Sequence, residues 1–73
     1  MRVFFKTDSI KRILIRKNKS QNWLASKIKV SSGYMSQLME GTRNPSPKVR
    51  ERLMEVMKVS NFDDLFRIHD EER

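Results

Sequence analysis

Apolar residues recur along most of this chain at every third or fourth position, which is the spacing of an amphipathic helix. Leu24 and Ile28 share one face in this pattern, and Met35 and Leu38 share another. Glycine and proline are scarce and gather between residues 33 and 47, which is typical of a helical bundle. The pattern predicts five short helices, at about 9–18, 21–28, 32–40, 47–58 and 61–68.

Small polar residues and glycine mark where the middle helices begin and end. Ser20 and Ser31 are suited to cap the second and third helices, because a serine hydroxyl accepts a hydrogen bond from an unpaired backbone N–H. Ser46 followed by Pro47 is the corresponding signal for the fourth helix. Gly41 is expected to end the third helix, since glycine adopts a positive φ readily.

The outer helices have weaker signals. Thr7 or Asp8 is expected to cap the first helix and Ser60 the fifth. These boundaries predict an all-α, five-helix domain that uses the whole chain. Its parts are an N-terminal arm at 1–7, a helical core at 8–68 and a flexible tail at 69–73.

The composition limits the class of protein. A chain of 73 residues with 37% hydrophobic residues can build one small domain with a modest core. It has no cysteine and a single histidine, His69, so neither a disulfide framework nor a transition-metal site is expected. No apolar run approaches the roughly 20 residues of a membrane-spanning helix. We therefore expect no metal, no cofactor and no membrane, and the lack of cysteine is compatible with the cytoplasm.

The residue types also argue against an enzyme. Acidic residues gather between 63 and 72, where no pair of carboxylates predictably converges, and the chain has no glycine-rich phosphate loop. His69 lies in a polar segment, where a solvated histidine is the simpler interpretation.

Charge is the strongest global feature. The chain has 16 Lys and Arg against 9 Asp and Glu, a net charge of +7 and a pI near 10.3. Such an excess favours a polyanionic partner, most often nucleic acid and less often an anionic membrane, although a merely soluble basic domain is the plain alternative. The basic residues crowd into 2–29 and 43–58, so they bracket the segment 30–39, which has no charge at all.

This uncharged segment has an unusual outward face. If the apolar residues of the third helix point inward, small or hydrogen-bonding residues point outward: Ser32, Gly33, Ser36, Gln37 and Glu40. A glycine inside a helix costs about 1 kcal/mol relative to alanine. A surface that must approach another molecule closely would offset that cost, but a short helix that simply avoids crowding would have the same residues.

The major groove of DNA suits such a face. The groove admits an α-helix, and Gln and Ser side chains can hydrogen-bond to base edges there. Lys27, Lys29, Arg43 and Lys48 would flank the face and meet phosphates.

The segment SQNWLASKIKVSSGYMSQLMEGTRNP, residues 20–45, resembles the helix-turn-helix of the lambda-repressor-like family of the Cro/XRE type. The most specific elements of the resemblance are Gln21 with Leu24 and Ala25, the KVS turn at 29–31, and Gly41 followed by the RNP of 43–45. The resemblance extends over about residues 8–68. It implies a cytoplasmic, nucleoid-associated regulator of prokaryotic or phage origin.

The resemblance implies a role for each matching residue. Gln21 would bond a phosphate and brace the third helix, Gln37 would contact a base, and Ser32 would be the next candidate. Arg43 and Asn44 would lie in a loop that grips the DNA backbone. The complete implied DNA-binding set is Ser20, Gln21, Ser31, Ser32, Gly33, Tyr34, Ser36, Gln37, Arg43, Asn44 and Lys48.

Four positions depart from the family's pattern. Lys29 stands where the turn usually has glycine, so a left-handed lysine would cost about 1 kcal/mol. Leu14 and Met39 replace a frequent Arg–Glu pair with two apolar side chains, which avoids a lone buried charge. Trp23 replaces an exposed polar residue; we expect it to pack on the N-terminal VFF segment, with a partner surface as the alternative.

The expected function is sequence-specific binding of double-stranded DNA by a transcriptional repressor, with the third helix in the major groove. The alternative is a protein-interaction module on the same fold, such as an antitoxin or antirepressor, which would expose apolar residues on that helix.

One recognition helix reads few base pairs, so a homodimer on a palindromic operator is expected. The residues that would form the dimer contact, or else close the core, are Phe62, Leu65, Phe66 and Ile68.

Overall fold

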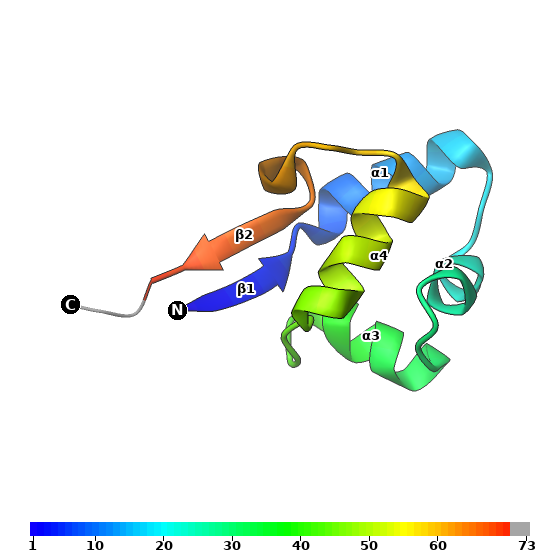
Figure 1. Ribbon diagram of the computed structural model, residues 1–73. Coiled ribbons are helices and arrows are strands. Elements are labelled where there is room, and N and C mark those ends of the chain that lie inside the picture. The colour runs from blue at the N-terminus through cyan, green and yellow to red at the C-terminus, as the bar shows by residue number, and fades with distance from the viewer. Residues whose placement is uncertain (71–73) are drawn as a thin grey trace.

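The computed structural model describes residues 1–70 and contains four α-helices and a two-stranded antiparallel sheet (Figure 1). The elements follow in the order β1 (Arg2–Phe5), α1 (Thr7–Lys17), α2 (Gln21–Lys27), α3 (Ser32–Glu40), α4 (Pro47–Met57), a 3-10 turn (Phe62–Asp64) and β2 (Phe66–His69). The domain is therefore mixed α/β, and the predicted five-helix, all-α fold is wrong.

The error lies at the two ends of the chain. The expected fifth helix is a single 3-10 turn followed by β2, and its cap is Asn61 rather than Ser60. The expected N-terminal arm contains β1, and His69, which was assigned to the tail, ends β2. Residues 71–73 of the expected tail lie outside the described part of the chain.

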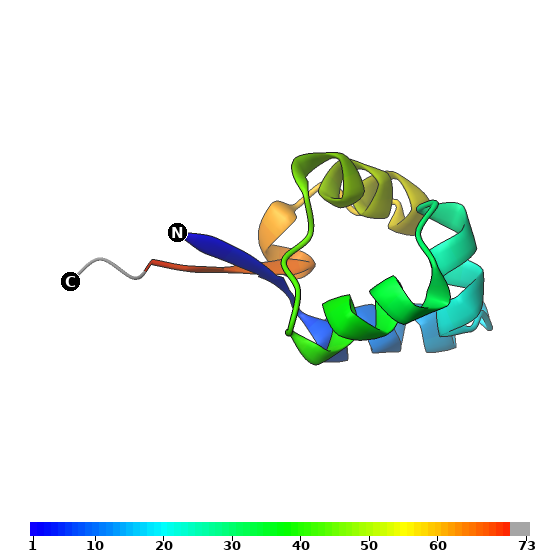
Figure 2. The same ribbon diagram turned by 90° about the horizontal axis from the view of Figure 1, so that it is seen from below.

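The sheet joins the two ends of the chain side by side. Arg2 pairs with His69 and Phe5 pairs with Phe66 in the antiparallel register. Aromatic and β-branched residues in both strands suit a half-buried pleated surface. The sheet projects from one side of the helices, as Figure 2 shows, and contributes to a long axis of 41 Å against 25 and 20 Å for the others.

All four helices end with the same backbone arrangement. A residue in the left-handed region follows α1, α3 and α4 directly and α2 after one further residue, and its own N–H and the N–H of the next residue bond carbonyls of the last turn. The four left-handed residues are Asn18, Lys29, Gly41 and Lys58. Gly41 was predicted, and the left-handed conformation expected at Lys29 is confirmed, with φ 64°.

The helix starts are as predicted for three helices. The hydroxyls of Ser20, Ser31 and Ser46 each accept a hydrogen bond from the backbone N–H three residues later. The expectation for α1 is wrong, because its cap position is Lys6 and no side chain caps it. The Thr7 hydroxyl instead donates to the Met39 carbonyl at 2.7 Å, which ties the start of α1 to the end of α3.

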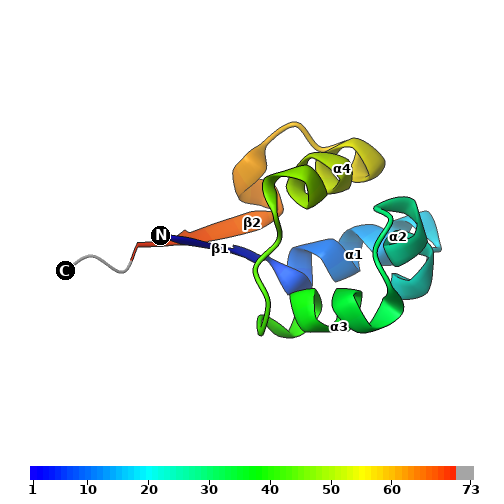
Figure 3. The same cartoon turned by 60° about the horizontal axis from the view of Figure 1, so that its bottom comes forward.

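The core fills the centre of the helical part, and the helices surround it (Figure 3). Leu14 and Met39 are both buried there, and as apolar side chains they place no charge inside the core. Phe5 and Phe66 extend the core into the sheet, with ring centroids 5.9 Å apart. No polar or charged residue is buried among the described residues.

Candidate nucleic-acid interface

The candidate site is formed by α2, α3 and the connection 28–31 between them, and the two helices pack against each other. The connection is tight because Lys29 takes a positive φ and the Val30 N–H bonds the Ala25 carbonyl at 3.0 Å. Ala25 is buried, so only a methyl group lies on that part of α2.

α3 presents the outward face that the pattern of apolar residues predicts. Met35 and Leu38 are buried on its inner side, at 0% and 1% exposure. Ser32, Gly33 and Gln37 are exposed on the other side, and the remaining outward residues are Ser36, half-buried, and Glu40, exposed. The small and amide side chains thus lie on the surface.

Gln21 connects the two helices of the site. Its Nε2 lies 3.5 Å from Ser36 Oγ, which is a long hydrogen bond between α2 and α3. Because Gln21 is half-buried and bonded to α3, it braces that helix, which is one of the two roles expected of it.

Gln37 is not a free side chain. Its Oε1 accepts a hydrogen bond of 2.8 Å from Arg43 Nε, and the Arg43 guanidinium carbon lies 5.0 Å from the centre of the Tyr34 ring. Nothing in the sequence indicated this contact, because a linear pattern does not show that the loop after α3 returns along the helix.

Ser20, Ser31 and Asn44 have structural hydrogen bonds. The hydroxyls of Ser20 and Ser31 accept from the Trp23 and Tyr34 N–H groups at 3.0 and 3.1 Å as helix caps. The Asn44 amide donates to the Val3 carbonyl of β1 at 2.9 Å, so this residue fixes the loop against the sheet. The resemblance had implied only a contact to DNA for Asn44.

Exposed cations lie on the segments that precede and follow α3 in the chain. Lys27 and Lys29 lie at the end of α2, Arg43 lies in the loop after α3, and Lys48 lies at the start of α4. These are the four positively charged residues that were expected beside the uncharged face.

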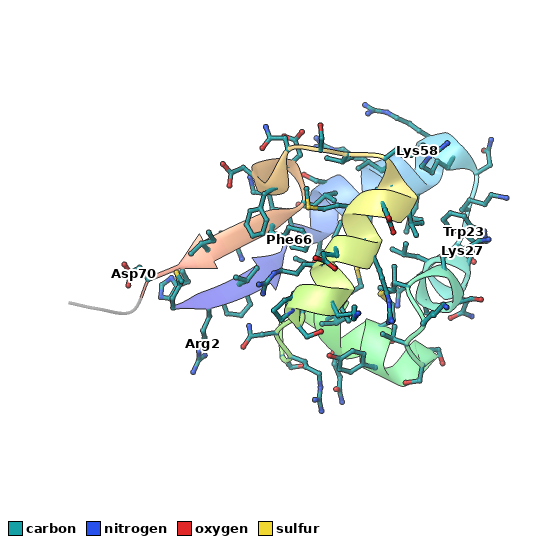
Figure 4. All side chains as sticks on the ribbon, viewed as in Figure 1. Arg2, Trp23, Lys27, Lys58, Phe66 and Asp70 are labelled. Carbon is teal, nitrogen blue, oxygen red and sulfur yellow. The ribbon has the colours of Figure 1, made fainter. Side chains whose placement is uncertain are left out.

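Trp23 lies at the far end of the molecule from the sheet, so its expected packing on the VFF segment is wrong (Figure 4). The ring is half-buried against the core, and the ammonium groups of Lys19 and Lys27 lie 5.4 and 6.0 Å from its centre. The contact with Lys27 has a sequence signal, since residues four apart meet on one helix face. Lys19 precedes α2 and had no such signal.

The four residues proposed for a dimer contact do not form one surface. Leu65 and Phe66 are 0% and 1% exposed and close the core, which was the alternative interpretation. Phe62 is half-buried, with its ring 4.7 Å from that of Phe66, and Ile68 is 49% exposed on β2. The helix that would have brought the four together is absent from the described chain.

The described residues include no group of three or more His, Cys, Asp or Glu side chains placed to hold a metal ion. Within the same residues, every helix is too short or too polar to cross a membrane. A scan against protein-family models, a search of curated proteins and a search of solved structures each gave no match to this chain.

Proposed function

We propose that this protein binds double-stranded DNA at specific sequences and acts as a transcriptional repressor, with α3 in the major groove. The observation that carries the proposal is the outward face of α3. It is uncharged from Ser32 to Met39. Ser32, Gly33 and Gln37 on it are exposed, and exposed Lys and Arg side chains lie on the segments that precede and follow α3. Among common partners, a duplex has a matching surface, with polar base edges between two rows of phosphates.

The arrangement of α2 and α3 supports the same proposal. In a helix-turn-helix the second helix enters the groove with its N-terminal residues toward the base edges, while the first crosses the backbone. Ser32 and Gly33 are the first residues of α3, and Gln21 begins α2. Gln21 would then lie near a phosphate while it braces α3 through Ser36.

A protein-interaction module is the weaker proposal. Such a module would expose large apolar side chains on α3. In the described part of the chain, the exposed large hydrophobic residues are Met1, Ile15 and Ile68, on the N-terminus, α1 and β2. The face of α3 has polar residues instead, which favours DNA.

We propose two copies of the chain on a palindromic operator. A single α3 of nine residues reaches only a few base pairs, which is too little for useful specificity. Two recognition helices about 34 Å apart would read successive major grooves on one side of the duplex.

Selection of bound duplexes from random DNA tests the proposal. We expect an inverted repeat with half-site centres about 10 base pairs apart. Duplexes recovered without any shared sequence would contradict specific binding, and an asymmetric site would contradict the symmetric dimer alone.

A matched pair of charge reversals tests the location of the interface. Lys29 and Lys58 are both exposed, and both have a left-handed φ at the end of a helix. Lys29 follows α2 in the proposed interface, whereas Lys58 follows α4 on the opposite side of the molecule from α3 (Figure 4). Lys29→Glu should weaken DNA binding about tenfold or more, because it replaces a phosphate contact with a repulsion. Lys58→Glu should change it much less, and equal losses would place the interface elsewhere.

A further inference from the structure

Gln37, Arg43 and Tyr34 form one connected unit on the outward side of α3, here called the QRY unit. Arg43 Nε donates to Gln37 Oε1 at 2.8 Å, and the Arg43 guanidinium stacks over the Tyr34 ring at 5.0 Å. Gln37 and Arg43 are exposed, and Tyr34 is half-buried and packs against the core. The unit is therefore anchored to the core through Tyr34, while Gln37 and Arg43 remain accessible from solvent.

The backbone around the QRY unit holds it in place. Gly41 turns the chain back, and the backbone N–H of Thr42 bonds the Gln37 carbonyl at 3.0 Å. The Thr42 hydroxyl lies 3.3 Å from the same carbonyl oxygen. Because Arg43 is the next residue, its guanidinium is anchored close to the side chain that it bonds. Less rotamer freedom is then lost when the unit meets a partner.

The hydrogen bond fixes which way the Gln37 amide points. An arginine Nε–H can only donate, so the atom facing it must be the amide oxygen and not the nitrogen. The two N–H groups of Gln37 Nε2 are then left for a partner, together with the Nη groups of Arg43. Oε1 keeps one lone pair, but that lone pair lies beside a cation, which disfavours the approach of a second donor.

This geometry changes the base that Gln37 can read. A free glutamine reads adenine through both ends of its amide, accepting from N6 and donating to N7. The QRY unit instead offers a cluster of N–H donors next to a positive charge. Guanine is the base with two neighbouring acceptors, O6 and N7, on its major-groove edge.

We propose that the QRY unit is a guanine reader, in which Arg43 sets the orientation of Gln37 and adds its own donors, and Tyr34 holds Arg43 in place. The inference rests on the proposed DNA-binding function and goes further, because it assigns a base preference. It also gives Arg43 a part in sequence reading, in place of a contact to phosphate alone.

The test measures binding of the selected duplex and its single-base replacements by the wild-type protein and four variants. The base pair that Gln37 contacts is identified as the one at which Gln37→Ala no longer discriminates between the four bases. At that position the wild-type protein should prefer guanine over adenine by at least about fivefold. Arg43→Ala should remove this preference or turn it toward adenine, because the Gln37 oxygen becomes free.

Tyr34→Phe and Tyr34→Ala form the matched control. Phenylalanine keeps the ring face, so the guanine preference should remain within about twofold of the wild type. Alanine removes the support under Arg43, so the preference should fall. A preference that survives in Tyr34→Ala would show that the ring does not position Arg43.

The outcomes separate the two proposals. If the wild-type protein binds the selected duplex no better than random DNA, the proposed function fails. If binding is specific but Arg43→Ala weakens the guanine and adenine duplexes by the same factor, Arg43 meets only phosphate and the guanine reader is wrong. Adenine preferred by the wild type would overturn it as well.

A measurement without DNA tests the unit itself. The Arg43 Nε–H proton should exchange with solvent several-fold more slowly in the free wild-type protein than in Gln37→Ala, as observed by nuclear magnetic resonance. Equal exchange rates in the two proteins would show that the Gln37–Arg43 hydrogen bond is not formed in solution, and the inference would fall.

Discussion

The two glycines of this chain lie in opposite backbone environments, one inside α3 and one at its end. A methyl group added at Gly33 would meet no atom within 4 Å, and its φ is not in the left-handed region. Gly41 also has open space, but its φ of +85° is strained for any other residue. The fold therefore requires glycine at position 41 and not at position 33.

We predict opposite stability changes at these two positions. Gly33→Ala should raise the free energy of unfolding by about 0.4–1 kcal/mol, because alanine restricts the unfolded chain and favours helix. Gly41→Ala should lower it by about 1–2 kcal/mol through the left-handed strain. Urea denaturation of both variants measures the changes. A loss of stability in Gly33→Ala would show that glycine has a structural role there.

The same Gly33→Ala variant tests why glycine stands on this face. If the backbone of α3 approaches the duplex closely, the added methyl group should weaken binding to the selected site even though the protein becomes more stable. A stabilised variant with unchanged affinity would mean that glycine at position 33 is merely tolerated.

At the scale of elements, the sequence predicted the helix boundaries that are set by local interactions. Serine caps, the Ser46–Pro47 start and the turn at Gly41 act over three or four residues, so α2, α3 and α4 were placed within about a residue or two. The outward face of α3 followed from periodicity for the same reason. The hydrogen bonds that join Gln37 to Arg43 and Asn44 to Val3 depend on how elements meet, and these were missed.

The sheet was missed because its pairing is long-range. Residues 62, 65 and 66 fit a helical face, and residues 66–69 alternate equally well as a short strand. What decides between them is a partner strand more than 60 positions away, since Val3 pairs with Ile68. The short VFF segment alone gives no sign of that pairing, and a short apolar run is ambiguous between strand and helix.

β2 offers a matched test of its buried start and its exposed end, because Phe66 and Ile68 lie two residues apart on one face of the strand. Phe66 is 1% exposed and contacts the rings of Phe5 and Phe62, whereas Ile68 is 49% exposed. Phe66→Ala should lower the free energy of unfolding by about 3–5 kcal/mol, because a large buried side chain leaves a cavity. Ile68→Ala should cost well under half of that, since much of its surface is already in water. Similar costs for both, measured in urea, would contradict the difference in burial between Phe66 and Ile68.

The burial of Phe66 also changes what an acidic substitution there would do. On a helical dimer contact, Phe66→Asp should give a folded monomer. With Phe66 in the core, the same variant should unfold, because an unpaired carboxylate would be buried. A chain of this length has a total stability of only about 4–11 kcal/mol. Sedimentation and circular dichroism of the variant distinguish the two outcomes.

For the whole molecule, charge decides how binding depends on salt. A protein with net charge +7 releases counterions from DNA when its Lys and Arg side chains meet phosphates. If two copies together neutralise roughly 8–10 phosphates, a plot of log K against log salt concentration should have a slope of about −8. The slope should flatten in Lys29→Glu and stay nearly unchanged in Lys58→Glu, because only the first removes a contact in the proposed interface. A wild-type slope shallower than about −2 would mean that few phosphates are contacted, and DNA would then be the wrong partner whatever the polarity of α3.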